Sequence, residues 1–376
     1  MTETEDRLSG RLTSLDAFRG ATIAAMILVN NPGSWSHVYA PLRHAPWHGW
    51  TPTDLIFPFF LFIVGVAMPI SFGRRRERGQ SRRRLFRHVL RRSLILFGLG
   101  LFMASFPTFS EWGSLRIMGV LQRIGVVYAI AATLYLTVGP RSRWAVVWAL
   151  LLGYWAALTL VPVPGFGSGD LSPEGNLAAY IDRITLGQSH LWQARAWDPE
   201  GLLSSLPAVA TCLLGVFTGE WILSSRNREL KVRGLAAAAA AAVGLGLTWD
   251  LLFPVNKNLW TSSYVVLTAG MAGLVLAGFY WLIEIRGRRA WSKPFVIYGM
   301  NAIAVFVASG LLTRLLVRWQ VPSVGGTRSV YTWIYDEVFA SWAGPLNGSL
   351  LFALSYILFW LAAMWVLFRK GVFVKI

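Results

Sequence analysis

The sequence predicts an all-α protein, a polytopic membrane helical bundle of about ten transmembrane helices with both termini in the cytoplasm. Composition gives the first two reasons. Of 376 residues, 55% are hydrophobic and only 14% are charged, whereas soluble domains carry about 25% charged residues. The mean hydropathy is +0.50. The third reason is that the charges are grouped in short blocks between long apolar runs. A single Cys also excludes a disulfide-stabilised scaffold.

The apolar runs have the length of membrane spans. A helix needs about 20 mostly apolar residues to cross about 30 Å of hydrocarbon. The runs do not alternate in polarity, which argues against strands. We expect the ten spans to form a single transmembrane domain over 1–376. They cover residues 16–33, 54–73, 92–108, 117–138, 143–162, 202–223, 233–252, 261–284, 294–313 and 348–368.

The links between the runs set the predicted orientation. Residues 74–92 hold ten Arg, and the links 139–144, 224–233 and 285–293 are also basic. These four links alternate with less basic ones. Because basic links stay in the cytoplasm, 74–92 is predicted to be a basic cytoplasmic loop and 163–201 a periplasmic loop. This topology explains the net charge of +17. We expect a bacterial inner (cytoplasmic) membrane, contact with anionic membrane lipid and no nucleic-acid partner.

Several polar residues fall where the membrane makes them costly, so each is a functional candidate. Asp16 and Arg19 lie three residues apart on one helix face, where they form either an interfacial salt bridge or a functional pair. Asn30 and Asn31 end the same helix, where either is also an ordinary cap. Arg123 lies about one turn inside its span and is expected to face a partner or a polar cavity.

A second cluster lies in the aromatic loop RHAPWHGWTPTDLIFPFF, residues 43–60. His44 and His48 both exchange protons near neutral pH. Thr51 is suited to cap the next helix, and Asp54 then falls in its first turn. Asp54 is therefore either simple helix-start chemistry or a partner for a histidine.

A third cluster is WDLLFPVNKNLWTSS, residues 249–263, on the predicted outer side. Asn256, Lys257 and Asn258 form a compact set of donors beside Trp260. The Trp side chains belong either to an interfacial aromatic belt or to a sugar-stacking surface. The sequence has no HExxH, P-loop or GxSxG motif, so we expect no metal.

In this order, the clusters resemble the membrane acyltransferase family of heparan-alpha-glucosaminide N-acetyltransferase and its bacterial relatives. The resemblance implies transfer of an acetyl group from cytosolic acetyl-CoA to the amine of a terminal glucosamine across the membrane. It also implies an active-site His at His44, a functional Asn at Asn30 and a homodimer. The matching stretches are RLTSLDAFRG (11–20), LVN (28–30), RHAPWHGWTPTDLIFPFFLFIVG (43–65), RIMGVLQRIG (116–125), PVNKNLWTSSYV (254–265), YGMNAI (298–303) and LFRKGVFVKI (367–376).

These parallels lead to a hypothesis for each residue. His44 acts either as general base in direct transfer, the route we favour, or as an acetyl carrier. Asn30 polarises the thioester carbonyl or orients His44, and Asp54 fixes the His44 tautomer. His48 is expected to be dispensable. The acetyl-CoA-binding candidates are Arg19, Arg123 and Lys257, and the substrate-binding candidates are Trp47, Asn256, Asn258, Trp260 and Asn301.

The alternative function is a transporter or flippase of a small anion or a lipid-linked saccharide. Ten spans with buried charges suit it equally well on composition. Transporters often show internal repeats with broken helices, and no repeat of fixed period is visible here. Consumption of acetyl-CoA would discriminate the two. The sequence leaves open the identity of the periplasmic saccharide acceptor, and whether its acetylated group is an amine or a hydroxyl.

Overall fold

The computed structural model describes residues 12–109, 112–323 and 326–374. Arg11, which begins the first matching stretch, and the last two residues of the tail stretch lie outside these ranges. Contacts divide the chain into two compact units. Unit 1 comprises residues 1–44, 51–56 and 278–376, and unit 2 comprises residues 45–50 and 57–277. Each unit is described by itself.

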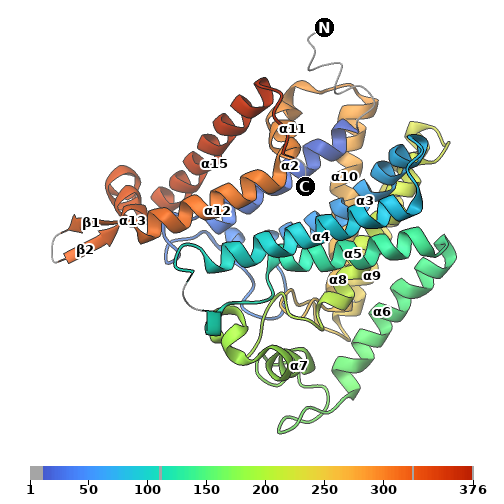
Figure 1. The fold of residues 1–376 in the computed structure, drawn as a ribbon, viewed down its shortest axis with the longest axis horizontal. Coiled ribbons are helices and arrows are strands. Elements are labelled where there is room, and N and C mark those ends of the chain that lie inside the picture. Colours follow the sequence, from blue (N-terminus) through green and yellow to red (C-terminus); the bar gives the residue numbers. More distant parts are fainter. Residues whose placement is uncertain (1–11, 110–111, 324–325, 375–376) are drawn as a thin grey trace. The chain divides into compact units, whose positions relative to one another are not determined.

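The secondary structure is almost entirely helical (Figure 1). Unit 1 holds α2 (Thr13–Asn30), η1 (Ala40–Leu42), η2 (Pro52–Leu55), η6 (Trp281–Ile285), η7 (Ala290–Ser292), α11 (Lys293–Met300), α12 (Ala302–Arg318), β1 (Gln320–Ser323), β2 (Gly326–Ser329), α13 (Val330–Ile334), η8 (Tyr335–Ala340), α14 (Ser341–Ala343) and α15 (Pro345–Arg369). Unit 2 holds nearly all of α3 (Ile56–Glu77) and α10 (Ser262–Tyr280), together with α4 (Arg82–Ser105), η3 (Trp112–Ser114), α5 (Val120–Thr137), α6 (Pro140–Leu160), α7 (Leu177–Leu186), η4 (Gln188–His190), η5 (Trp192–Ala194), α8 (Ser205–Leu223) and α9 (Arg228–Asp250).

The helices agree with an all-α membrane protein. Within the described residues, eight helices are long and apolar enough to span a membrane, or nine if a pair bent by 71° at Asn301 counts as one span. The predicted number of ten stays a prediction. Helix α2 covers most of the first expected span but is not among the eight. Asp16 and Arg19 lower the hydropathy of this 18-residue helix.

Two predicted loops contain helix. The basic segment 74–92 is mostly helical, because α3 continues to Glu77 and α4 already begins at Arg82. Arg is a good helix former, and the Ser81 hydroxyl caps α4 by accepting from the Arg84 N–H at 3.4 Å. The segment 163–201 contains α7, η4 and η5. The antiparallel β1–β2 hairpin has no counterpart among the elements expected from the sequence.

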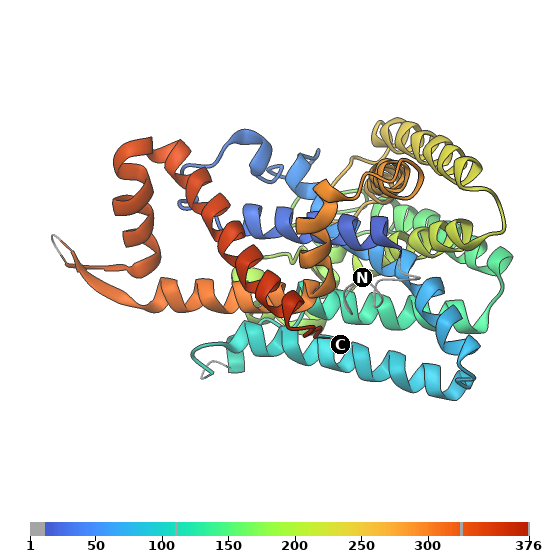
Figure 2. The ribbon, with the colours of Figure 1, turned by 90° about the horizontal axis from the view of Figure 1, so that it is seen from above.

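In unit 1, the first half of α2 packs closely against α11, and the two helices lie side by side in both Figure 1 and Figure 2. Glycines allow this approach. A Cβ on Gly20 would overlap the Phe295 carbonyl oxygen, and a Cβ on Gly299 would overlap the Asp16 carbonyl oxygen. The Ser14 N–H also donates to the Glu284 carboxylate at 3.0 Å. Helix α2 is thereby fixed in the unit that carries His44.

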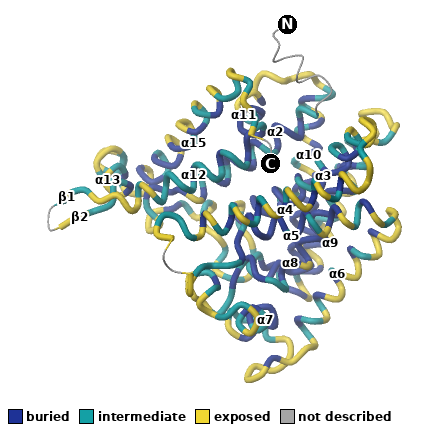
Figure 3. Tube along the Cα trace, in the orientation of Figure 1, coloured by how far each residue is buried: buried dark blue, intermediate teal, exposed yellow. Residues whose placement is uncertain are grey.

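In unit 2, α5 packs on α4 and α8, and α6 packs on α8. Glycines Gly65 and Gly215 let α3 and α8 touch backbone to backbone, since a Cβ on either would overlap a carbonyl oxygen of the other helix. Cys212 is buried beside this contact, as expected for a small apolar side chain. Figure 3 shows the buried residues concentrated on the inner helices, while only 28% of the apolar window of α6 and 17% of that of α9 are buried.

Candidate active site

A histidine–carboxylate pair lies in unit 1, where the loop before α3 turns into the helix. The His44 Nδ1 is 2.6 Å from Asp54 Oδ1. The carboxylate is enclosed and the imidazole is accessible, with side-chain exposures of 2% and 47%. The sequence predicts this pairing, in which Asp54 fixes the His44 tautomer. A buried carboxylate beside an exposed imidazole is an arrangement suited to proton transfer.

Local sequence holds the pair in place. Thr51 and Asp54 form a capping box, in which Asp54 Oδ2 accepts from the Thr51 N–H at 3.0 Å and from its hydroxyl at 3.2 Å. The Thr51 hydroxyl also lies 2.6 Å from the Arg43 carbonyl oxygen. Pro52 begins the helical turn with its fixed φ. The helix-start interpretation of Asp54 and its role as a histidine partner are therefore both true, because each uses a different carboxylate oxygen.

The hydrogen bond selects the imidazole tautomer. A carboxylate accepts, so Nδ1 carries the proton and Nε2 carries the lone pair. Asp54 also stabilises the imidazolium that forms when Nε2 takes up a proton. His44 thus has the electronic arrangement of a general base or a nucleophile acting through Nε2.

The end of α2 holds two asparagines in different environments. Asn30 is exposed, and in the described part of the chain its side chain makes no hydrogen bond. Asn31 is buried, donates to the Ile27 carbonyl at 2.8 Å and accepts from the Thr313 hydroxyl at 2.6 Å. The Thr313 hydroxyl in turn is 3.1 Å from the Tyr356 hydroxyl. This network was not predicted from the sequence, because Thr313 and Tyr356 lie about 280 and 325 residues after Asn31. Asn30 keeps its amide available for a ligand.

Two further candidates in unit 1 already have protein partners. Arg19 pairs with Asp16 at 3.1 Å, as predicted, and retains 22% of its side chain exposed. Asn301 is 1% exposed. Its amide donates to the Val372 carbonyl at 3.1 Å and accepts from the Val374 N–H at 2.8 Å. Both ends of the Asn301 amide therefore hold the C-terminal tail in this structure, and its expected contact with a substrate stays a prediction.

In unit 2, the segment 45–50 is attached to the loop that precedes α10. The Gly49 N–H donates to the Val255 carbonyl at 2.7 Å, and Asn256 Nδ2 lies 3.3 Å from His48 Nδ1. Burial lowers the pKa of His48, although Asp250 opposes this shift. This shift favours the neutral imidazole, and His48 takes part in the loop contact with Asn256.

Trp47 is a partly exposed aromatic residue of the same segment. Its indole N–H donates to the Leu171 carbonyl at 2.7 Å, and its ring meets Trp197 edge-on at 5.0 Å. Polar anchoring of one edge leaves part of the ring accessible, which is the arrangement of a stacking surface.

The residues of the cluster from Asn256 to Trp260 differ in how far they are buried. Asn256 is fully buried, and its Oδ1 accepts the Leu259 N–H at 2.9 Å. Trp260 is also fully buried, with its indole N–H on the Thr211 hydroxyl at 3.1 Å. The expected contact of Trp260 with a sugar stays a prediction, and in this structure its side chain is enclosed. Lys257 and Asn258 are partly exposed and stay candidates for binding.

Arg123 is fully buried beneath this cluster. It hydrogen-bonds the Gly201 carbonyl at 3.1 Å and the Ser204 hydroxyl, and its guanidinium lies 5.0 Å from the centre of the Trp260 ring. Its Nε and Nη1 have no hydrogen-bond partner, so the ring face supplies the remaining stabilisation of the charge. The expectation of a partner is confirmed. The enclosure leaves no surface for acetyl-CoA in this conformation.

Arg116 anchors an acidic cluster that the sequence analysis did not identify. Its guanidinium contacts Asp198 at 2.6 and 2.9 Å and Glu200 at 2.5 Å. Both carboxylates are buried. Burial alone would raise the pKa of Glu200, but Arg116 and its neighbours lower it. The sequence WDPEG contained the signal, namely two acids in an aromatic link, although nothing local identified their partner.

Comparison with known proteins identifies the family. The model of the family described as "Heparan-alpha-glucosaminide N-acetyltransferase, catalytic" matches residues 11–253. The chain belongs to this family. It is 33% identical over 359 residues to the heparan-alpha-glucosaminide N-acetyltransferase of Homo sapiens, covering 80% of this chain and 53% of the relative. It is 31% identical over 368 residues to the Mus musculus protein of the same name, covering 82% of this chain and 55% of the relative. The chain thus spans about half the length of these curated relatives.

The family match contains the His44–Asp54 pair and Asn30, whereas Asn256 to Trp260 and Asn301 lie beyond the matched range. The family resemblance expected from the sequence is therefore confirmed. Within the described residues, no group of three or more His, Cys, Asp or Glu side chains is arranged to hold a metal ion.

The buried carboxyl of Asp182 on α7 leads us to expect a pH-dependent stability. Burial raises the pKa of Asp182 to about 7, with Asp198 adding to the shift and the Leu202 N–H opposing it. Between the ordinary Asp pKa of about 3.9 and 7, the folded protein holds a proton that the unfolded chain has lost. The free energy of unfolding is therefore expected to fall as pH rises through this window, by up to about 1.4 kcal/mol per pH unit. Asp182→Asn should flatten the decline in Tm between about pH 4 and 7.

Glu174→Gln serves as the control, because Glu174 is exposed in the same link. This variant should keep the pH dependence of the unchanged protein. An Asp182→Asn protein with the original pH slope would show that another group titrates.

Proposed function

We propose that this protein is a transmembrane acetyltransferase that moves an acetyl group from cytosolic acetyl-CoA to an amine or hydroxyl of a periplasmic saccharide. Two observations support this. The chain belongs to a family of N-acetyltransferases, and its His44 carries a buried carboxylate partner within the matched range. The second observation carries the proposed mechanism, because such a pair can supply a positioned base for acyl transfer.

The proposed chemistry is a direct transfer. The acceptor nitrogen or oxygen attacks the thioester carbonyl carbon while His44 Nε2 removes its proton. The tetrahedral intermediate collapses, the carbon–sulfur bond breaks, and the imidazolium returns the proton to the leaving CoA thiolate. Asp54 fixes the tautomer before the attack and stabilises the imidazolium during it. Asn30 donates its amide N–H to the carbonyl oxygen as negative charge develops there.

In the alternative route, His44 Nε2 attacks the thioester first. An acetyl-imidazole then forms, and the CoA thiol leaves before the acceptor reacts. We favour direct transfer because it requires no second conformational state. The two routes differ in whether CoA is released without an acceptor.

We assign ligand contacts to side chains that are partly exposed, and positioning roles to side chains that are buried. Arg19 is the proposed contact for the CoA phosphates, since part of its side chain is accessible. Trp47, Lys257 and Asn258 are proposed acceptor contacts, because stacking and hydroxyl recognition need partly exposed groups. For Arg123, Asn256 and Trp260 we propose a positioning role, in which they hold the loop that carries Lys257 and Asn258.

The function is tested by CoA-thiol release from acetyl-CoA by the purified protein, with and without glucosamine. Release that depends on the acceptor supports the proposed transfer. A single turnover without acceptor supports the acetyl-imidazole route. If no amino sugar supports release and acetyl-CoA does not bind, the enzyme proposal fails and the transporter reading replaces it.

A further inference from the structure

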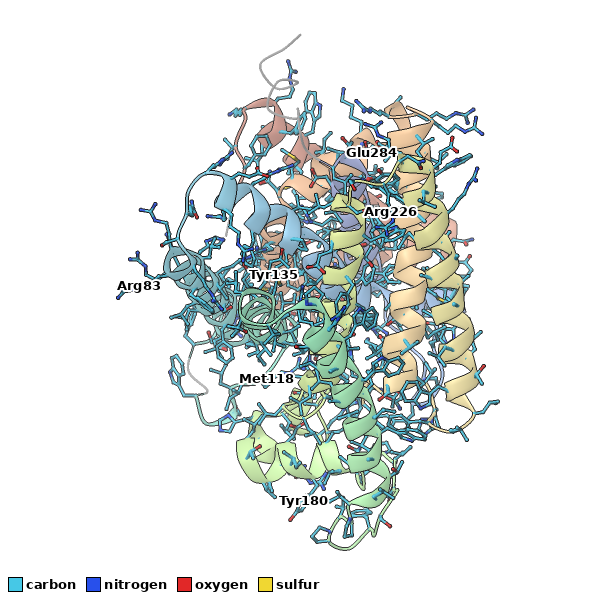
Figure 4. All side chains as sticks on the ribbon, turned by 90° about the vertical axis from the view of Figure 1, so that its right-hand side faces the viewer. Arg83, Met118, Tyr135, Tyr180, Arg226 and Glu284 are labelled. Atoms are coloured by element: carbon cyan, nitrogen blue, oxygen red, sulfur yellow. The ribbon has the colours of Figure 1, made fainter. Side chains whose placement is uncertain are left out.

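The largest apolar cavity described for unit 2 is a groove that the acetyl-transfer proposal does not use. Its volume is about 790 Å³, and its lining comes mainly from α6, α8, α9 and α10. Trp144, Trp148 and Phe217 form an aromatic wall, while Ala238 and Ala241 belong to the facing surface on α9. Figure 4 labels Arg226, which lies in the link between α8 and α9.

The groove has the depth of one membrane leaflet. Its lining on α6 runs from Pro140 to Leu151, and its lining on α9 runs from Gly234 to Leu245. At a rise of 1.5 Å per residue, each stretch is about 16 Å long, which is about half of the 30 Å hydrocarbon core. Both stretches start near the links that their positive charge predicts to be cytoplasmic. The groove therefore accommodates acyl chains of that leaflet.

The end of the groove is cationic. Arg226 lines it and lies 4.5 Å from the centre of the Trp221 ring. Glu220 also lines it but is engaged with Arg143 at 2.7 Å. In the described part of the chain no carboxylate pairs with Arg226. A guanidinium held on an aromatic face at the end of an apolar groove complements a phosphate diester.

We propose that this groove binds an anionic glycerophospholipid, with its acyl chains between α6 and α9 and its phosphate at Arg226. Charge argues against a second copy of the chain as the occupant. A two-fold symmetric contact brings the same surface together from both copies, so it would bring the basic link 224–233 of one copy toward that of the other. An anionic lipid instead supplies the opposite charge.

Native mass spectrometry of the purified protein tests the proposal with added phosphatidylglycerol or phosphatidylcholine. Ala241→Phe fills the groove, and Ala240→Phe is its matched control. Both residues are exposed on α9, but only Ala241 lines the groove. We expect Ala241→Phe to reduce retained phosphatidylglycerol about tenfold, and Ala240→Phe to leave it unchanged. Reduced retention in only the first variant would locate the lipid in the groove.

A second pair of variants tests the headgroup. Arg226→Glu should reduce the preference for phosphatidylglycerol over phosphatidylcholine by about fivefold or more, since one basic residue near an anionic surface contributes about 1 kcal/mol. Arg228→Glu changes charge equally in the same link but outside the groove lining, so it should leave the preference unchanged.

Three results would overturn the proposal: equal retention by Ala241→Phe and Ala240→Phe, equal loss of preference in both Arg variants, or a loss of dimer mass in Ala241→Phe alone. The last would make the groove an interface between copies. Because the readout is bound lipid and not acetyl transfer, failure here leaves the proposed function untouched.

Discussion

His44→Ala is expected to lower acceptor-dependent release of CoA thiol by about 10²–10⁴-fold, the usual contribution of a positioned general base. The reason is that Nε2 is the proposed proton acceptor and no other group of the His44–Asp54–Thr51 arrangement replaces it. Asp54 is buried against the Thr51 N–H and hydroxyl. The loss should fall on kcat, because the imidazole acts in the transition state and is not a proposed contact of the CoA nucleotide.

The matched control for His44→Ala is His37→Ala. His37 is an exposed loop histidine of the same unit, with only Ser34 near its ring nitrogen at 3.4 Å, so its removal should leave kcat unchanged. His48→Ala should cost far less than His44→Ala, because the His48 ring contacts Asn256 and Trp47 and has no proposed part in proton transfer. A variant lacking His44 that still turns over at the original rate would remove this histidine from the mechanism.

Asp54→Asn separates orientation from proton transfer at the same site. An amide still occupies the position but no longer stabilises the imidazolium, and it accepts poorly from Nδ1. We expect kcat to fall while acetyl-CoA binding is retained. Equal loss of binding would instead indicate that the substitution disrupts the capping box, because Asp54 Oδ2 also accepts from the Thr51 N–H.

The parts of the site that could be predicted are those formed by neighbouring residues. Thr51, Pro52 and Asp54 are a helix start in any context, and the ten-residue interval to His44 places both groups in one loop. Asp16 and Arg19 pair because a helix brings residues three apart to one face. Such short-range rules also explain why the basic and apolar blocks predicted an all-α membrane protein.

Contacts between residues far apart in the sequence could not be predicted from such short-range rules. Trp260 was expected at a sugar because Trp rings stack on sugars, yet Arg123, 137 positions earlier in the chain, covers its ring. Asn301 was expected at a substrate, but the C-terminal tail occupies its amide. In both cases the residue type was informative about chemistry, while its partner was set by tertiary packing.

Arg116→Met is expected to reduce the free energy of unfolding by about 3–5 kcal/mol. This is the typical cost of removing one partner of a buried ion pair, because the other charge is left buried and uncompensated. Arg116 holds two carboxylates at once. Asp198 also accepts the Trp192 and Glu200 N–H groups at 2.8 Å, so this acid cannot turn toward water without releasing the link that carries it. A lower Tm in detergent, followed by tryptophan fluorescence, is the measurement. Arg233→Met is the matched control, because Arg233 forms an exposed pair with Glu229 at 3.4 Å and such pairs contribute little.

The triple variant Arg116→Met, Asp198→Asn, Glu200→Gln distinguishes charge from packing in this cluster. If the cost of Arg116→Met is that of two uncompensated buried carboxylates, neutralising them should recover much of the lost stability. Asp198→Asn keeps only one acceptor oxygen for two backbone N–H groups, so recovery should be incomplete. A triple variant no more stable than Arg116→Met would show that the guanidinium acts mainly by filling space between two links, the one that ends at Arg116 and the one that carries Asp198 and Glu200. The link that carries Asp198 and Glu200 continues into Gly201 and Ser204, which hold Arg123. Arg123 in turn lies on Trp260, next to Lys257 and Asn258 in the chain. In that case the cluster would position the Lys257–Asn258 loop through packing alone.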